Sequence, residues 1–324
     1  CFWLGASDPH RGYEKGSGQS SGMDPAGINL FDHFPDSPVI RNDVADYYFE
    51  VQRFDQDVGS FVSRLEELGV LANTLIVVTG DHGMPFPRCK ANLYDSGARV
   101  PLAIQWPARI KAGRGVKDFV STTDLAPTFL EAAGVAVPEA MTGRSLLKLF
   151  ARSESDPIEA GRDHVLMGKE RHVPGQEGTN LGGTPMRAIR THDHLLIHNH
   201  HPDRWPAGTP NHEKAAFKGA WIADCDNGPT KTYMVQFRDK DDDHRLKYDL
   251  AFGRRPAFEL YDLKKDPGQL NNVAALPAYE TIRKNLFNRL KNGLKATGDP
   301  RMNGKGDAFD RYPYFGGGPK FPGF

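Results

Sequence analysis

The stretch Thr74-Leu-Ile-Val-Val-Thr79, followed directly by Gly80-Asp81-His82-Gly83, decides the fold of this chain. A continuous apolar and β-branched run between turn residues predicts a central strand that is buried on both faces. In open α/β sheets, functional groups gather beyond the carboxyl ends of the strands. We therefore expect a functional site at the polar residues that follow this strand.

A long helix is predicted immediately before this strand. Asn42 or Asp43 can cap it, and Gly69 can end it. Apolar residues recur between them at three- and four-residue spacing, namely Val44, Tyr47, Tyr48, Val51, Phe54, Val58, Phe61, Val62, Leu65 and Leu68. A helix that leads into a buried strand is typical of α/β folds, and its apolar stripe must pack against another layer.

The same pattern repeats downstream. Val100 to Trp106 predicts a strand and Thr123 to Ala133 predicts a helix, in whose first turn Pro127 is tolerated. His164 to Gly168 predicts one further strand. The first part of the chain thus favours an α/β domain, which we place at residues 1–183.

The pattern changes from about residue 184. Residues 186–198 and 257–263 predict antiparallel strands, and residues 279–294 predict a helix with apolar positions at helical spacing. Strands without intervening helices favour a smaller α+β domain with an antiparallel sheet, at residues 184–324.

Composition excludes several classes of protein. The 324 residues carry 41 basic and 41 acidic side chains, so the net charge is zero. A nucleic-acid binder that works by counterion release needs a basic excess, so no nucleic-acid partner is expected. No apolar run approaches the roughly 20 residues of a membrane span. The three cysteines are far apart and form no zinc pattern.

The chain opens on Cys1-Phe-Trp-Leu-Gly-Ala6, which predicts a buried strand already in progress. We therefore expect these residues to begin inside a fold.

Asp81 and His82 form the strongest local candidate site. A carboxylate beside an imidazole, flanked by glycines, can offer an oxygen and a nitrogen to a metal ion. The residues are equally compatible with a polar turn in which Asp81 caps the next segment of backbone.

Asp8-Pro9-His10-Arg11 is a second candidate, because it also follows an apolar run. Pro9 stiffens the corner. His10 can deliver a proton near neutral pH, and Arg11 offers a planar set of donors to a tetrahedral oxyanion. A surface turn is the alternative.

Two charged loops could contribute to substrate binding. Arg88 and Lys90 are two residues apart, so in an extended stretch they share a side, and one of them could reach an anion at Asp81. Glu170, Arg171 and His172 follow a predicted strand and could line a pocket or form an exposed turn. No signature supports Cys89 as a nucleophile.

Several short motifs together resemble those of the type I sulfatases of the alkaline-phosphatase superfamily, in particular the heparan N-sulfatase (sulfamidase) branch. The motifs are Asp8-Pro-His-Arg11, Asn73-Thr-Leu-Ile-Val-Val-Thr-Gly-Asp-His-Gly-Met-Pro-Phe-Pro87, Lys90-Ala-Asn-Leu-Tyr94, Asp124-Leu-Ala-Pro-Thr128, Thr142-Gly-Arg-Ser-Leu146, Pro185-Met-Arg187, Glu259-Leu-Tyr-Asp262 and Asp266-Pro267. Each motif is short, but their joint order is specific.

The resemblance implies an alkaline-phosphatase-like α/β sandwich with a central mixed sheet, incomplete at its N-terminal side. It also implies an enzyme that hydrolyses sulfate esters or sulfamates of sulfated glycans. The nucleophile of such enzymes is a formylglycine made from Cys or Ser, and the metal is calcium, with magnesium as the alternative. Carried over by position, Asp81 and His82 would bind the metal. Lys90 would face the sulfate, and His10 would contact it and protonate the leaving group.

The family's nucleophile motif and its paired aspartates belong upstream of the segment matched by Asp8 to Arg11. Cys1 is followed by Phe-Trp-Leu and does not fit that motif. We therefore expect the nucleophile and the remaining metal ligands before residue 1, and these residues alone to bind metal weakly and to be inactive. The resemblance also implies an exported compartment, periplasmic, extracellular or lysosome-like, and leaves a homodimer open.

Two other functions remain as alternatives. One is a phosphodiesterase or phosphonate hydrolase of the same superfamily, which would use a related metal site. The other is a non-catalytic scaffold that binds a glycan or another anion.

Overall fold

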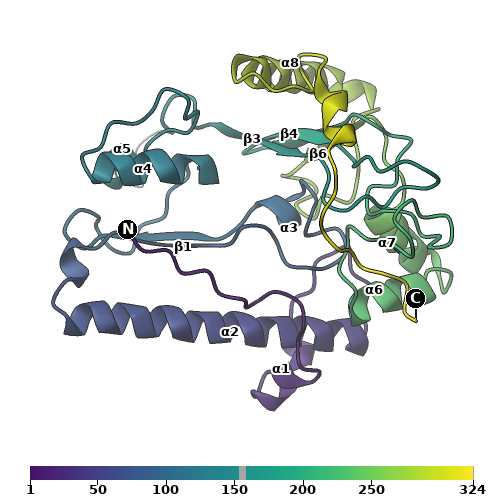
Figure 1. The fold of residues 1–324 in the computed structure, drawn as a ribbon, viewed down its shortest axis with the longest axis horizontal. Coiled ribbons are helices and arrows are strands. Elements are labelled where there is room, and N and C mark those ends of the chain that lie inside the picture. The colour runs from purple at the N-terminus through teal and green to yellow at the C-terminus, as the bar shows by residue number, and fades with distance from the viewer. Residues whose placement is uncertain (153–157, 324) are drawn as a thin grey trace.

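The computed structural model describes residues 1–152 and 158–323 and contains two separate sheets (Figure 1). The smaller is an antiparallel ribbon of β1 (Ile76–Thr79) and β2 (Leu102–Gln105), in which Val77 pairs with Ile104. The larger is an antiparallel sheet of four strands in the order β3-β4-β5-β6.

Helices cover both sides of the ribbon (Figure 1). The helix α2 (Pro38–Glu67) runs along one side, and α4 (Leu125–Ala132) and α5 (Leu147–Phe150) lie on the other. This layered arrangement of helices and strands confirms the predicted α/β class. Both predicted strands and the second predicted helix form close to their expected positions.

The helix α2 begins earlier than predicted. Ser37 is its N-cap, and the Ser37 hydroxyl accepts a hydrogen bond from the backbone N–H of Ile40 at 3.3 Å. Pro38 occupies the first turn, where its missing N–H costs nothing. Neither predicted cap acts as one, because the Asn42 amide donates to the Pro38 carbonyl and Asp43 pairs with Arg11.

Burial in this region is less complete than predicted. Every residue of β1 is only partly buried, although the sequence predicts burial on both faces. In α2 the buried apolar residues are Ile40, Val44 and Ala45, whereas Phe61 is 43% exposed. The reason is geometric. Among the described residues only β2 pairs with β1, and a ribbon of two strands covers little of a helix of 30 residues.

The predicted strand at Cys1–Ala6 does not form. These residues are exposed and have no regular secondary structure. A strand needs a neighbour to pair its backbone groups, and among the described residues no strand pairs with this segment.

The larger sheet contains β3 (His164–Lys169), β4 (Met186–Thr191), β5 (His194–Asn199) and β6 (Phe258–Asp262). The helix α8 (Glu280–Ala296) lies across one face of it (Figure 1). Because side chains alternate along a strand, Ile189, Leu196 and Leu260 share the face that packs against Leu286 and Leu290 of α8. The predicted antiparallel strands and the predicted helix are thus confirmed.

The strand β3 pairs with β4 along its whole length, from His164 opposite Thr191 to Lys169 opposite Met186. The larger sheet therefore includes a strand from residues 1–183 and three from residues 184–324. The division of the chain at residue 183 stays a prediction.

The remaining elements are short, and they connect and cover these layers. They are α1 (Ser17–Ser20), α3 (Asp95–Ala98), α6 (Pro229–Gln236), α7 (Asp242–Phe252) and the 3-10 turns η1 (Pro25–Gly27), η2 (Leu71–Asn73), η3 (Thr122–Asp124), η4 (Pro277–Tyr279) and η5 (Gly306–Arg311). No helix within residues 1–152 or 158–323 has both the length and the apolar character that a membrane crossing requires.

Candidate functional site

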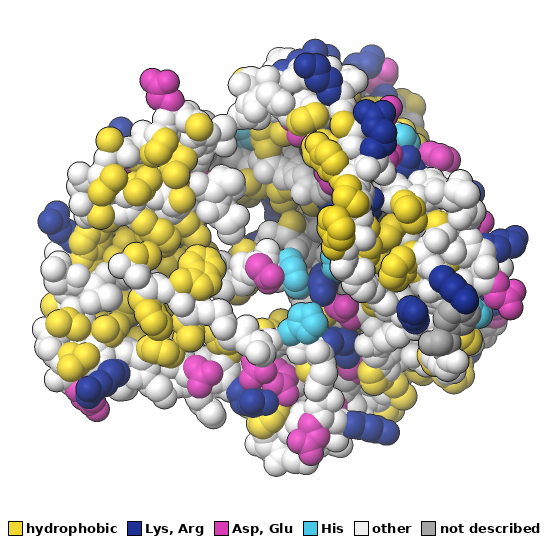
Figure 2. All heavy atoms as spheres, viewed as in Figure 1, with side chains coloured by type: hydrophobic (Ala, Val, Ile, Leu, Met, Phe, Trp, Pro, Cys, Tyr) yellow, Lys and Arg dark blue, Asp and Glu magenta, His cyan; other side chains and the backbone are white. Residues whose placement is uncertain are grey.

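A large cavity of about 2160 Å³ lies between the ribbon and the four-stranded sheet. In the space-filling view it opens near the centre of the molecule, with histidine and acidic side chains at its edge (Figure 2). Six of the predicted site residues line it: His10, Asp81, His82, Lys90, Arg171 and His172. They come from four separate stretches of sequence, which the fold brings to one place.

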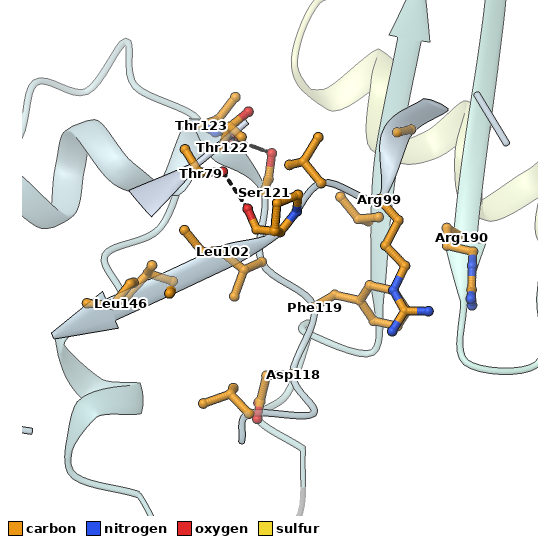
Figure 3. A pocket seen from close by; sticks show the side chains of 18 of the residues that line it. Thr79, Arg99, Leu102, Asp118, Phe119, Ser121, Thr122, Thr123, Leu146 and Arg190 are labelled. Atoms are coloured by element: carbon orange, nitrogen blue, oxygen red, sulfur yellow. Dashed lines mark hydrogen bonds between the residues drawn. The ribbon is translucent and has the colours of Figure 1, made fainter. Parts of the chain in front are cut away.

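The walls of the cavity differ in character. Leu102, Leu146 and Thr79 lie around the ribbon, whereas Arg99 and Arg190 lie toward the four-stranded sheet (Figure 3). Arg190 is held by Asp95, whose two carboxylate oxygens accept its hydrogen bonds at 2.9 and 2.8 Å. The cavity therefore combines a wall that includes Leu102 and Leu146 with a wall that carries ion-paired charged groups, among them Asp95 itself.

Asp81 and His82 follow β1 directly, at the edge of the cavity. The Asp81 carboxylate accepts a hydrogen bond from the backbone N–H of His82 at 2.9 Å. His82 Nδ1 lies 2.8 Å from the Gly83 carbonyl oxygen. Because a carbonyl only accepts, Nδ1 carries the proton in this contact, and in a neutral imidazole Nε2 is then the nitrogen with the lone pair. That nitrogen lies 3.5 Å from the other Asp81 oxygen.

This pair of atoms suits a cation, because a carboxylate oxygen and an imidazole lone pair lie close enough to share one ion. The donor set is incomplete for calcium, which takes about six to eight oxygen ligands. The residues fit a metal ion as part of a larger set of ligands.

Gly83 holds this corner against α3. Its backbone N–H donates to the Gly97 carbonyl at 2.8 Å. A Cβ at Gly83 would lie 2.0 Å from the backbone oxygen of Ser96, which is far too close. The glycine after His82 is therefore required by the close approach of two backbone segments.

His10 and Arg11 turn to different places. His10 is exposed and lines the cavity. The Arg11 guanidinium instead lies on α2, where it donates to both oxygens of Asp43 and to the Pro85 carbonyl. Burial by itself would lower the pKa of Arg11, but the Asp43 carboxylate raises it above its ordinary value. Arg11 lines a second, smaller cavity of about 610 Å³, which it shares with Glu50.

The side chains of Arg88 and Lys90 also point to different places, although an extended loop would put them on the same side. The loop is not extended, because Arg88 and Ala91 both adopt left-handed backbone conformations, with φ of 61° and 63°. Arg88 is 3% exposed, lies outside the cavity and donates to the carbonyls of Leu250 and Gln269 at 2.7 and 2.6 Å. Lys90 lines the cavity.

The charged segment Glu170–His172 also contributes only part of its side chains to the cavity. Arg171 and His172 line the cavity, and Arg171 also donates to the carbonyls of Leu181 and Tyr312. Glu170 does not line it, and its carboxylate pairs with Arg187 and Arg301 at 2.5 and 2.8 Å.

The general sulfatase family matches residues 6–135, and the family described as N-sulphoglucosamine sulphohydrolase, C-terminal, matches residues 80–205. Together the two matches cover every residue that lines the site. The chain belongs to the sulfatase family.

Two curated relatives and one solved structure illustrate the similarity. The sulfatase chain is 27% identical over 272 residues to an ulvan-active sulfatase of Formosa agariphila. The aligned region covers 84% of this chain and 41% of the relative. It is 30% identical over 288 residues to N-sulphoglucosamine sulphohydrolase of Homo sapiens, and this aligned region covers 86% of this chain and 52% of the relative. The sulfatase chain therefore spans about half the length of these relatives.

The solved structure comes from work on the metabolism of multiple glycosaminoglycans by Bacteroides thetaiotaomicron. It superposes with a TM-score of 0.62 at 18% identity, over 95% of this chain and 56% of that one. At this identity the match concerns the fold, and it confirms the alkaline-phosphatase-like sandwich expected of a sulfatase.

Two acidic residues that contact the cavity wall were not identified from the sequence. Asp226 accepts a hydrogen bond from Lys90 at 2.9 Å, and Asp224 accepts one from Lys169 at 2.5 Å. Burial alone would raise the pKa of Asp224, but Lys169 and His172 lower it to about 2. The signal in the sequence is slight, since it consists of two carboxylates in the otherwise apolar stretch Trp221-Ile-Ala-Asp-Cys-Asp226.

Proposed function

We propose that the protein containing these residues is a sulfatase that hydrolyses sulfate esters or sulfamates of sulfated glycans. The observation that carries the proposal is the gathering of His10, Asp81, His82 and Lys90 around one cavity, within the segments that match the family. These groups are a candidate proton donor, two candidate metal ligands and a candidate partner for an anion.

Each residue has a role that its position supports. Asp81 and His82 would hold calcium, or magnesium as the alternative, together with ligands from outside the described residues. The cation would supply positive charge against a bound sulfate group. Lys90 would bind a sulfate oxygen with an N–H that its contact with Asp226 leaves available. His10, which is exposed at the cavity, would protonate the leaving group.

The nucleophile in this proposal is a formylglycine that lies outside residues 1–324. We propose that residues 1–324 on their own bind the cation weakly and release no sulfate. The whole protein would act in an exported compartment, with a homodimer left open.

A glycan is the substrate class that the relatives favour, because one is described as active on ulvan and another as a sulphohydrolase of N-sulphoglucosamine. Arg171 and His172 at the cavity wall would contact it. Arg11, Arg88 and Glu170 make contacts that tie the structure together, so in this proposal they support the site without touching the substrate.

The test is sulfate release by the full-length protein from N-sulfated and O-sulfated glucosamine, with and without a calcium chelator. We expect release that the chelator abolishes and that Asp81→Asn reduces by at least about a hundredfold, the scale on which loss of a charge-stabilising group acts. As a matched control, Asp118→Asn removes another carboxylate of the cavity and should retain most activity.

Two results would overturn the proposal. Faster hydrolysis of a phosphodiester or phosphonate than of either sulfated sugar would identify a phosphorus hydrolase. Tight binding of the sulfated sugar without turnover by the full-length protein would identify a non-catalytic scaffold.

A further inference from the structure

The loop Trp221–Asn227 places two carboxylates behind the cations of the cavity wall. Asp226 binds the Lys90 ammonium at 2.9 Å, and Asp224 binds that of Lys169 at 2.5 Å. Asp224 also lies 3.6 Å from Nδ1 of His172. Lys90, Lys169 and His172 line the cavity, whereas neither carboxylate does. The two carboxylates therefore contact these cations without lining the cavity themselves.

The loop itself is wound around one buried ammonium group. Lys231 Nζ donates to the backbone carbonyls of Trp221, Ile222 and Cys225 at 2.8, 3.0 and 2.9 Å, and to Oδ1 of Asn227 at 2.8 Å. It also lies 4.6 Å from the centre of the Trp221 ring. Lys231 is 1% exposed, so water offers no substitute partner.

These contacts of Lys231 fix the backbone of the loop around Asp224 and Asp226. Asp224 lies in sequence between Ile222 and Cys225, whose backbone carbonyls both accept from Lys231. Asp226 lies between Cys225 and Asn227, whose side-chain oxygen also accepts from Lys231. Loss of the ammonium would leave the buried carbonyls of Trp221 and Cys225 without this donor, and each such group destabilises the arrangement. The acids could then no longer be held at hydrogen-bonding distance from Lys90 and Lys169.

We propose that Lys231 is a positioning residue, which holds the loop so that Asp226 fixes the protonated side chain of Lys90, and Asp224 that of Lys169, at the cavity wall. The lysines then present their remaining N–H groups to an anion in one orientation. The identity of that anion, a sulfate group, rests on the proposed function, but the positioning does not.

Competitive amine labelling tests the positioning directly, because only the neutral amine reacts with an acylating reagent. The full-length protein would be labelled at low reagent concentration and the rate at each lysine read by mass spectrometry. Asp226→Asn should raise the rate at Lys90 and leave Lys169 unchanged, and Asp224→Asn should do the reverse. We expect about a tenfold rise, which is the scale on which loss of one hydrogen bond to a charged group acts.

Lys231→Met should raise the rate at both lysines while each carboxylate is still present. Lys247 is the internal reference, since it is similarly covered and pairs with Asp243 at 2.8 Å on a different helix. A rise at Lys247 as well would show general loosening of the fold, and that result would overturn the proposal. So would unchanged labelling at Lys90 and Lys169. If Lys231→Met does not fold, the opposite patterns in the two Asp→Asn variants still decide whether the carboxylates fix the lysines.

Binding of a sulfated glucosamine by the full-length protein gives the second readout. Asp226→Asn should weaken binding about tenfold and Lys231→Met at least as much, and the double variant should bind no more weakly than Lys231→Met alone, because loss of Lys231 already removes the contact that Asp226 makes. Additive losses would contradict the inferred route. Wild-type protein that fails to bind the sugar would argue against the proposed function, while the labelling pattern would still decide the positioning.

Discussion

The Arg11 guanidinium donates to both carboxylate oxygens of Asp43, at 2.8 and 2.9 Å. The same carboxylate accepts from the backbone N–H and the hydroxyl of Thr230, at 3.0 and 2.6 Å. One acid therefore joins the corner after Pro9, the helix α2 and the beginning of α6. It connects the segment that carries His10 to the helix that carries Lys231.

We expect Asp43→Ala to lower the free energy of unfolding by about 3–5 kcal/mol, because it leaves a buried guanidinium without its counter-ion. Chemical denaturation measures this. Asp36→Ala is the matched control, since it breaks the bidentate pair that Asp36 forms with Arg41 on the surface, and it should leave the denaturation midpoint unchanged. Equal effects of the two variants would contradict the assignment of a structural role to the buried pair.

Arg88 should matter for stability and not for ligand binding. Arg88→Met leaves the carbonyls of Leu250 and Gln269 without a donor, and each unpaired buried group costs about 1–3 kcal/mol. The affinity for a sulfated sugar should stay within about twofold of wild type, a change too small to reflect a lost charged hydrogen bond. Weaker binding with unchanged stability would instead place Arg88 in contact with the ligand.

Gly83→Ala should disrupt the Asp81–His82 corner, because the new Cβ would meet the Ser96 carbonyl oxygen. We expect loss of calcium binding by isothermal titration calorimetry in the full-length protein. Gly59→Ala is the control, since a Cβ at Gly59 in α2 would meet no atom within 4 Å. In a helix interior that change should stabilise the protein by about 0.5–1 kcal/mol.

Low pH should reduce the free energy of unfolding, because Asp224 becomes protonated. Its pKa lies at about 2 in the folded state, below the ordinary 3.8, so the folded state favours the ionised carboxylate. That contribution is complete above pH 3.8 and is lost as the pH falls through about 2. At one pKa unit per 1.36 kcal/mol it amounts to about 2 kcal/mol.

The measurement is the free energy of unfolding of wild type and Asp224→Asn between pH 5 and pH 2, a range set about the folded and ordinary pKa values. The gap between the two proteins should narrow as the pH falls through this range. A gap that stays constant would show that Asp224 is not ionised more readily in the folded protein.

The sequence predicts the elements whose pattern is local. The strands β4, β5 and β6 and the helix α8 appear close to their expected positions, because their apolar alternation and spacing match the faces they bury. The start of α2 was missed because the Ser37-Pro38 signal lies before the first apolar repeat.

Contacts between distant residues could not be predicted in this way. Lys90 and Asp226 are 136 positions apart, and nothing in either segment indicates the other. Arg88 was expected beside the anion site because its left-handed backbone could not be read from an apparently extended loop. Asp81, His82 and His10 reach the same cavity as expected for residues that follow strands or stiff corners, although their chemical roles stay predictions.

The ribbon of β1 and β2 has a practical consequence for handling this polypeptide. Among the described residues no strand pairs with the outer edge of β1, so the backbone groups of Ile76–Thr79 on that side have no neighbouring strand. An open apolar edge is a template for pairing between molecules. Concentrated solutions of residues 1–324 should therefore self-associate through this segment, and a charged substitution at Val77 should delay the onset of aggregation.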